Sequence, residues 1–149
     1  MRQINQSGLD LIKSFETLQL QAYLPTPNDV WTIGWGHTLG VNEGDTCTEE
    51  QADAWLLDDL SGACAEVSQD ATAPLTDDEY AACVCLTFNI GRGAFRASTL
   101  LKKIDAGDYA GAAQEFLRWD KQAGVELAGL DRRRAAEEAL FLTPDGVES

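Results

Sequence analysis

A chain of 149 residues has the length of one domain, and folding would bury about two-thirds of its unfolded surface. Its 44% of hydrophobic and 24% of charged residues are ordinary for a globular protein, and no run approaches the roughly eighteen apolar residues of a membrane span. The formal net charge of −14 argues against nucleic acid as a partner, because a phosphate backbone repels an acidic surface.

The expected elements begin with a short N-terminal helix. Ser7–Asp10 has the pattern of a capping box, which predicts a helix that starts near Gly8. An apolar stripe follows at helical spacing, formed by Leu9, Ile12 and Phe15. Glu16 falls in the last turn, where the negative end of the helix dipole and partial burial both favour a protonated carboxyl group. A general acid that works near neutral pH requires that state.

Two short strands are expected next, at Tyr23–Leu24 and Val30–Trp35, because apolar and smaller residues alternate there. Between them, Pro25–Asp29 has the composition of a turn. A second capping box at Thr48–Gln51 predicts a long amphipathic helix that extends to about Ser68.

The rest of the chain reads as helical. A third capping box, Thr76–Glu79, opens a helix that Gly91 closes, and further helices are expected near 98–105, 109–119 and 131–142. These elements predict one α+β domain over residues 1–149. A small β-hairpin lobe of about 20–46 is joined by a helix of about 48–68 to a helical lobe of about 74–142, which includes the N-terminal helix. A cleft between two such lobes suits a polymeric ligand.

Three groups of residues along the chain carry a family resemblance. The first is Phe15-Glu16, followed by Thr32-Ile33-Gly34 and Gly36-His37-Thr38. The second runs from Leu86 to Leu101, and the third includes Trp119, Gly129-Leu130, Arg132–Arg134 and Glu137. Together they resemble the phage-type lysozymes, the endolysin muramidases of glycoside hydrolase family 24. The resemblance covers almost the whole chain and implies a lysozyme-like fold.

The resemblance implies a catalytic pair with one member missing. Glu16 matches the general acid, and Thr32 matches a hydroxyl that faces the attacking water, although threonine is also common in strands. Family members usually have an Asp two residues after the Tyr of an Ala-Tyr pair, where this chain has Pro25. Asp29 either substitutes for that carboxylate or only makes the bend. The stereochemical outcome therefore stays open, because an inverting enzyme places its base roughly 6.5–9.5 Å from the acid.

Other positions match the family's substrate-binding surface. Gly36, Thr38 and Phe88 correspond to residues that line the sugar-binding cleft, although Phe88 is equally well explained as a core residue. Glycine at position 36 would let the backbone approach a ligand closely. The resemblance makes His37 a hydrogen-bonded structural residue and not a proton shuttle.

The remaining charged and sulfur-containing residues leave alternatives. Arg132–Arg134 either contact cell-wall carboxylates or pair with Glu137 and Glu138 along their helix. The four cysteines lack the spacing of a zinc site, and neither a metal nor another cofactor is expected. Cys64 and Cys83 are expected to be small buried hydrophobes, whereas Cys47 would be able to form a disulfide in an oxidising periplasm.

The expected function is hydrolysis of the β-1,4 bond between N-acetylmuramic acid and N-acetylglucosamine in peptidoglycan, which lyses bacteria. The protein is expected to act as a monomer on glycan strands. Two alternatives stay open: a lysozyme-like glycan-binding or structural phage module that has lost turnover, and a lytic transglycosylase, which works from a single Glu. Pro25 and the negative charge favour the first of these alternatives.

The N-terminal residues and the charge bear on where such an enzyme acts. Met1–Gln6 contain no apolar segment of a signal peptide, so we expect synthesis in the host cytoplasm and release through the membrane by another route. A charge of −14 should be repelled by an anionic cell wall at low ionic strength. The acidity either keeps the protein soluble or reflects a salty habitat that screens this repulsion.

Overall fold

The computed structural model describes residues 2–122, 125–126 and 128–144. It divides into two compact units: the hairpin unit, Ile12–Ser61, and the helical unit, Met1–Leu11 with Gly62–Ser149. Helices and small antiparallel sheets make up the described chain, as the α+β prediction requires. The elements of the hairpin unit include the end of α1 (Gln6–Phe15), β1 (Gln19–Tyr23), β2 (Thr32–Gly34) and the start of α2 (Glu49–Asp70). The rest are α3 (Asp77–Ile90), α4 (Arg92–Arg96), α5 (Thr99–Asp105), α6 (Tyr109–Glu115), a 3-10 turn η1 (Phe116–Arg118), β3 (Lys121–Gln122), β4 (Val125–Glu126) and α7 (Ala128–Phe141).

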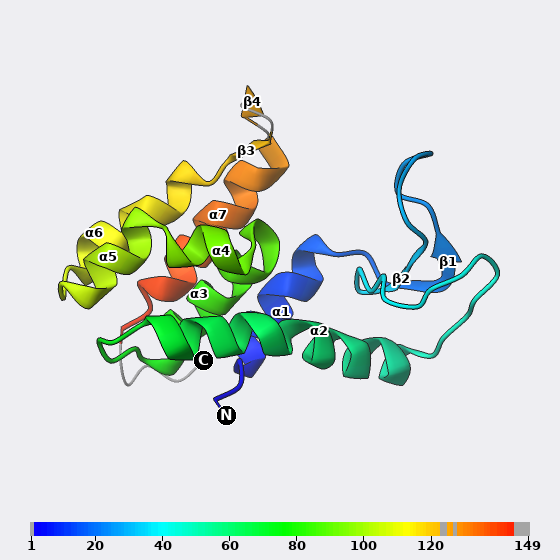
Figure 1. The fold of residues 1–149 in the computed structure, drawn as a ribbon, viewed down its shortest axis with the longest axis horizontal. Coiled ribbons are helices and arrows are strands. Elements are labelled where there is room, and N and C mark those ends of the chain that lie inside the picture. Colours follow the sequence, from blue (N-terminus) through cyan, green and yellow to red (C-terminus); the bar gives the residue numbers. More distant parts are fainter. Residues whose placement is uncertain (1, 123–124, 127, 145–149) are drawn as a thin grey trace. The chain divides into compact units, whose positions relative to one another are not determined.

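The hairpin unit is built on the antiparallel pair β1 and β2, in which Tyr23 lies opposite Thr32. The segment after the hairpin returns to the free edge of β1, where Ala22 donates to Asp45 and Cys47 donates to Leu20, each at 2.8–2.9 Å between backbone atoms. This second partner explains why β1 begins at Gln19 and not at Tyr23. β2 is shorter than predicted, and Figure 1 shows both strands beside the looping connection to α2.

The predicted capping boxes at the starts of α2 and α3 are confirmed. The Thr48 and Gln51 side chains each accept a hydrogen bond from the other's backbone, at 3.1 and 2.9 Å. Thr76 and Glu79 do the same at 3.1 and 2.8 Å. Such a cap contributes about 1 kcal/mol to a helix, because it satisfies amide groups that the helix leaves without a partner.

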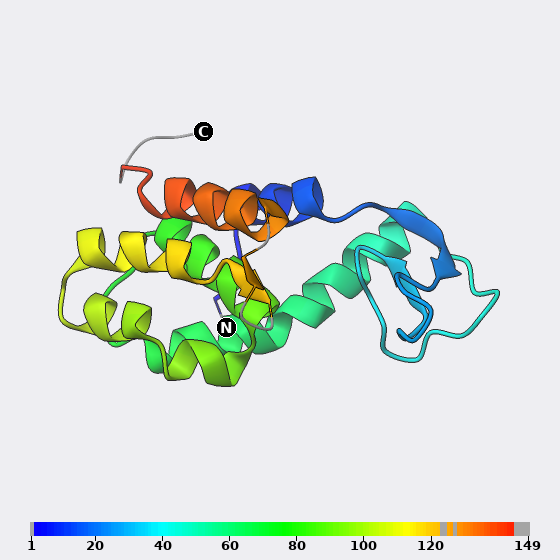
Figure 2. The ribbon, with the colours of Figure 1, turned by 90° about the horizontal axis from the view of Figure 1, so that it is seen from above.

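α3 forms the core of the helical unit, and every residue from Tyr80 to Thr87 is buried. α3 packs against α7, and α5 packs against α6 (Figures 1 and 2). Cys83 and Cys85 are buried on α3, and burial raises the pKa of both thiols. Cys64 is buried as well, so the prediction of small buried hydrophobes is confirmed, while Cys47 is a half-buried free thiol.

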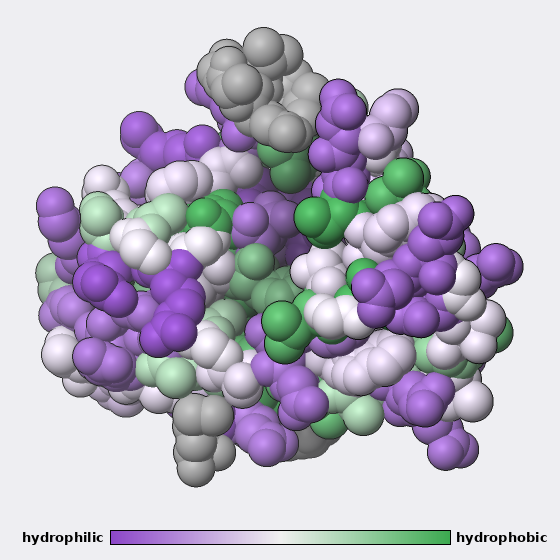
Figure 3. Space-filling model, turned by 45° about the vertical axis from the view of Figure 1, so that its right-hand side comes forward, coloured by the Kyte–Doolittle hydropathy of each residue, from purple (hydrophilic) through white to green (hydrophobic). Residues whose placement is uncertain are grey.

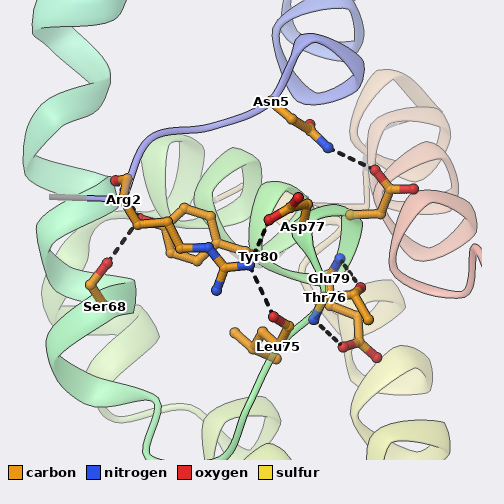
Figure 4. A network of polar contacts seen from close by, with 9 residues as sticks. Arg2, Asn5, Ser68, Leu75, Thr76, Asp77, Glu79 and Tyr80 are labelled. Atoms are coloured by element: carbon orange, nitrogen blue, oxygen red, sulfur yellow. Dashed lines mark hydrogen bonds and ion pairs between the residues drawn. The ribbon is translucent and has the colours of Figure 1, made fainter. Parts of the chain in front are cut away.

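The N-terminal segment is fastened to the start of α3 (Figure 4). The Arg2 guanidinium donates to Leu75 O at 2.9 Å and to Asp77 Oδ1 at 2.8 Å, and it lies 4.4 Å from the centre of the Tyr80 ring. The Tyr80 hydroxyl contacts the Arg2 carbonyl at 3.0 Å and the Ser68 hydroxyl at 2.9 Å. These contacts hold the N-terminal segment in place against α3.

Two details of the helices differ from the sequence prediction. α1 begins at Gln6, two residues earlier than expected, because Asn5 and not Ser7 caps it: the Asn5 side chain accepts from Gly8 N at 3.0 Å. The short helix α4 was not predicted. Its Arg92 and Arg96 side chains bind the buried carboxylate of Glu66 on α2, each at 3.0 Å.

The surface is mostly polar. Hydrophilic residues cover most of the outer part of the face shown in Figure 3, and hydrophobic residues gather toward its middle. Among the helices in the described part of the chain, none combines the length and apolar character that crossing a bilayer demands.

Candidate active site

Glu16 stands one residue beyond the end of α1. Its backbone N–H still donates to Ile12 O at 3.0 Å, so the helical hydrogen bonding holds the residue in place, and its side chain is half-buried. The carboxyl group faces the backbone of Gly36: a methyl group placed on Gly36 would lie 3.4 Å from Glu16 Oε2 and 3.9 Å from Oε1. The structure therefore brings together the two ends of the first sequence motif.

The turn that carries Gly36 is closed by its own backbone. Ile33 and His37 exchange N–H···O bonds of 2.9 and 2.8 Å, and Gly34 and Gly36 both adopt positive φ, at +66° and +90°. Side chains other than glycine rarely adopt this conformation. Gly34 also packs on α2, where an added methyl group would lie 3.0 Å from Ala52 Cβ.

His37 fixes the far side of this turn. Its Nδ1 lies 2.9 Å from Asp59 Oδ2, and its ring stacks on Trp55 with 4.7 Å between the ring centres. The residue is 8% exposed. The prediction of a hydrogen-bonded structural histidine is confirmed.

Thr32 is buried in β2, and its hydroxyl donates to Val30 O at 3.0 Å. A hydroxyl has one hydrogen to donate and two lone pairs to accept with. Since the hydrogen is used within the chain, Thr32 Oγ1 is left as an acceptor.

Asp29 lies in the exposed turn before β2. Its backbone N–H donates to Thr26 O at 3.1 Å, and its Oδ1 accepts from Val30 N at 2.9 Å. Asp29 therefore supports the bend, as one of the two sequence interpretations proposed.

Lys13, Asp53 and Trp35 form a polar cluster that the sequence analysis did not find. Asp53 Oδ1 accepts from Trp35 Nε1 at 2.8 Å and lies 3.0 Å from Lys13 Nζ. The hydrogen bonds from Lys13 and Trp35 hold the pKa of Asp53 below its usual range. Each residue lies far from the others in sequence, so no local pattern marks them as partners.

The predicted substrate-binding residues fall in both units. Thr38 is exposed next to His37 in the hairpin unit, and Phe88 is half-buried near the end of α3 in the helical unit. The residue after Phe88, Asn89, belongs to a hollow of about 450 Å³. The other residues that line this hollow are Ile90, Trp119, Lys121 and Leu130.

Two of the three arginines of α7 are buried inside the helical unit. Arg134 is fully buried, donates to Asn89 Oδ1 at 2.9 Å and lies 2.8 Å from Glu137 Oε1. Arg133 is buried as well, at 3.6 Å from Glu137. Pairing along the helix, one of the two predicted roles, is therefore confirmed for both residues. Arg132 is exposed.

Within the residues that the structure describes, no three His, Cys, Asp or Glu side chains are grouped to hold a metal ion. Glu16 supplies a carboxyl group that lies beside the backbone of the glycine turn. A carboxyl group can transfer a proton to a substrate oxygen that comes within hydrogen-bonding distance.

Both the sequence and the structure of this chain are similar to those of known proteins. Residues 13–137 match the family described as phage lysozyme. An endolysin of Acyrthosiphon pisum secondary endosymbiont phage 1 is 46% identical over 142 residues, which are 93% of this chain and 97% of that protein. The endolysin of Salmonella phage P22 is 37% identical and covers 96% of this chain and 100% of its own. Among solved structures, the muramidase domain of SpmX from Asticaccaulis excentricus has a TM-score of 0.88 at 41% identity, with 97% of this chain and 100% of that chain covered.

Proposed function

This chain belongs to the phage lysozyme family, and from that premise we propose that Glu16 is the general acid with which it cleaves peptidoglycan. The class of activity follows from the family: the protein is a lysozyme that hydrolyses peptidoglycan and lyses bacteria. At the finer level, we assign it to glycoside hydrolase family 24 and place the scissile bond between N-acetylmuramic acid and N-acetylglucosamine.

The position of Glu16 opposite Gly36 is the observation that carries this assignment. A general acid must reach the glycosidic oxygen within hydrogen-bonding distance. Gly36 has no side chain, so no β-carbon of that residue stands between its backbone and the Glu16 carboxyl group. The gap is narrow enough that one methyl group would touch Glu16 Oε2, at 3.4 Å.

Thr32 is proposed to orient the attacking water. Its hydroxyl hydrogen is committed to Val30 O, so a water molecule can only donate to Thr32 Oγ1. A water that donates one hydrogen to Thr32 keeps its lone pairs free to attack the anomeric carbon. Held in this way, the water needs less reorientation before attack.

Asp29 is proposed as the partial replacement for the carboxylate that Pro25 removes. Its Oδ1 accepts from Val30 N, and Val30 O accepts from Thr32, so Asp29 and Thr32 hold the same residue. Asp29→Asn keeps an acceptor for Val30 and removes the charge, whereas Asp29→Gly removes both. If the negative charge of Asp29 takes part in catalysis, both variants should lose activity. If Asp29→Asn keeps full activity, Asp29 serves only as a turn residue.

The glycan is proposed to contact Gly36 and Thr38 in the hairpin unit and Phe88 in the helical unit. The hollow beside Phe88 adds an indole ring, Trp119, and an amide, Asn89, that Arg134 holds in one orientation. Aromatic faces and fixed amides are groups that bind sugar rings and their N-acetyl substituents. We propose that the enzyme acts as a monomer, does not bind nucleic acid and acts at the cell wall after release through the membrane.

Three variants test the site. Glu16→Gln removes the acid and keeps the shape of the side chain, so activity on purified peptidoglycan should fall by about 10²-fold or more with unchanged unfolding temperature. Gly36→Ala and Gly44→Ala place a methyl group at similar positive φ, +90° and +87°, but only the first meets Glu16. Both should lose similar stability, and only Gly36→Ala should lose most of its activity. Equal activity of the two glycine variants would contradict the proposed site.

A further inference from the structure

One carboxylate oxygen in the hairpin unit joins three segments of the chain. Asp53 Oδ1, on the second turn of α2, is 3.0 Å from Lys13 Nζ at the end of α1 and 2.8 Å from Trp35 Nε1 in the glycine turn. Lys13 Nζ also lies 5.2 Å from the centre of the Trp35 ring. The three side chains, which we name the Asp53 brace, therefore contact one another pairwise.

The brace sits next to both halves of the proposed acid site. Lys13 precedes Glu16 by three residues, and Trp35 directly precedes Gly36. The gap between the Glu16 carboxyl group and the Gly36 backbone is one that a single methyl group would fill, so we expect loosening of either arm to change it. Errors of about 1 Å in such a gap reduce rates by as much as roughly 10²-fold.

The Asp53 brace also determines where the positive charge of Lys13 is held. Lys13 precedes Glu16 by three residues, the spacing at which side chains on a helix are neighbours, so an ammonium group released from Asp53 would be able to approach Glu16. An ammonium group beside Glu16 would stabilise the ionised carboxylate, which cannot act as an acid. Asp53 offers the same ammonium group a carboxylate at 3.0 Å, on the α2 side. His37 and Asp59, the other titratable pair fixed to this turn, bind each other at 2.9 Å.

We infer that Asp53, with Lys13 and Trp35, is a positioning residue for catalysis: it sets the gap between Glu16 and Gly36 and keeps the Lys13 charge on α2. This inference rests on the proposed role of Glu16. It assigns no contact with substrate to Asp53 itself.

The test compares four variants in steady-state kinetics on soluble peptidoglycan oligomers between pH 5 and pH 9. Asp53→Ala removes the brace, and Lys13→Met/Asp53→Ala removes the released charge as well. Trp35→Phe removes only the indole N–H, and Asp58→Ala is the matched control, an exposed aspartate on the same helix. Unfolding temperatures are measured in the same buffers.

For Asp53→Ala we expect kcat to fall roughly 10-fold with little change in KM, because positioning and not affinity is lost. The alkaline limb of the pH profile should move to lower pH, because a freed ammonium group near the site favours the ionised form of the acid. The double variant should return the limb to its original position while kcat stays low. Trp35→Phe should lower kcat and leave the limb in place.

The inference is overturned if Asp53→Ala matches Asp58→Ala in kcat and in the alkaline limb, whatever its unfolding temperature. It is also overturned if the limb stays displaced in the double variant, since Lys13 would then not be the cause. Glu16→Gln, measured in parallel, separates the two levels. If Glu16→Gln loses activity and Asp53→Ala has no effect, only the inference about the Asp53 brace is refuted. If Glu16→Gln stays active, the proposed role of Glu16 is refuted, and the inference about the brace falls with it.

Discussion

Replacing Asp70 by Asn should stabilise the protein at pH 8 and leave its stability at pH 4 unchanged. Asp70 lies one helical turn after Glu66 on α2, so the two carboxyl groups are neighbours whose charges repel each other. Arg92 and Arg96 of α4 bind Glu66, and Arg96 holds the pKa of that carboxyl group down at about 2. Burial and the Glu66 carboxylate raise the pKa of Asp70 to about 6.

The direction of the change in stability follows from the raised pKa of Asp70. The folded protein holds the Asp70 proton more tightly than the unfolded chain, whose pKa is near the ordinary 3.8. The stabilisation is therefore complete below about pH 4 and is lost as pH rises through 6. Glu66 has the opposite sign, because its low pKa makes its contribution disappear only as pH falls from 4.5 toward 2.

The difference between 3.8 and about 6 corresponds to about 3 kcal/mol at pH 8 if solvent screened none of it. Arg96 is 63% exposed, so water reaches the cluster, and we expect about 1 kcal/mol. For a chain of this length, that is an increase in unfolding temperature of about 3 °C. The Asn amide resembles the protonated acid in shape and, like it, carries no negative charge beside Glu66.

Thermal unfolding followed by circular dichroism at pH 4 and pH 8 measures this difference. Asp58→Asn is the control, because it removes one negative charge from an exposed position on the same helix and so matches the change in net charge. Equal gains for the two variants at pH 8 would assign the effect to net charge. A loss of stability in Asp70→Asn at both pH values would refute the reasoning.

Three further predictions concern the core, the N-terminus and the charge. Glu137→Ala should cost about 3 kcal/mol in urea unfolding, because it leaves the buried Arg134 guanidinium without its carboxylate at 2.8 Å; a cost below 1 kcal/mol would contradict the importance of this pair. Tyr80→Phe should cost about 1 to 2 kcal/mol in the same assay, because its hydroxyl contacts the carbonyls of Arg2 and Cys64, each at 3.0 Å; an unchanged midpoint would mean that water replaces it. Initial rates on washed cell walls should rise from low to moderate ionic strength, because salt screens the repulsion between a net charge of −14 and an anionic wall; a steady fall would indicate that a local basic patch governs binding.

The elements that sequence patterns predicted well are those whose cause is local. The capping boxes at Thr48 and Thr76 place both partners within three residues, so the pattern and the structure agree. The start of α1 was misplaced because two caps competed, and the structure uses Asn5. α4 was missed because its sequence begins between two glycines, and its ion pairs connect it to Glu66, 26 and 30 residues earlier.

The candidate site was predictable only through the family resemblance. Glu16 and Gly36 are twenty residues apart, and no periodicity relates them; their apposition depends on the hairpin and on the contact of Gly34 with Ala52. The Asp53 brace was missed for the same reason, since Lys13, Trp35 and Asp53 show no common spacing. Exposed charged residues look alike in a sequence until the structure shows which of them share a partner.

Mass spectrometry of the products from purified peptidoglycan tests the central claim most directly. Hydrolysis with Glu16 as the acid predicts muropeptides with reducing N-acetylmuramic acid ends from the natural protein and none above background from Glu16→Gln. Anhydro ends would identify a transglycosylase. Reducing ends produced by Glu16→Gln at the natural rate would contradict the assignment of the acid.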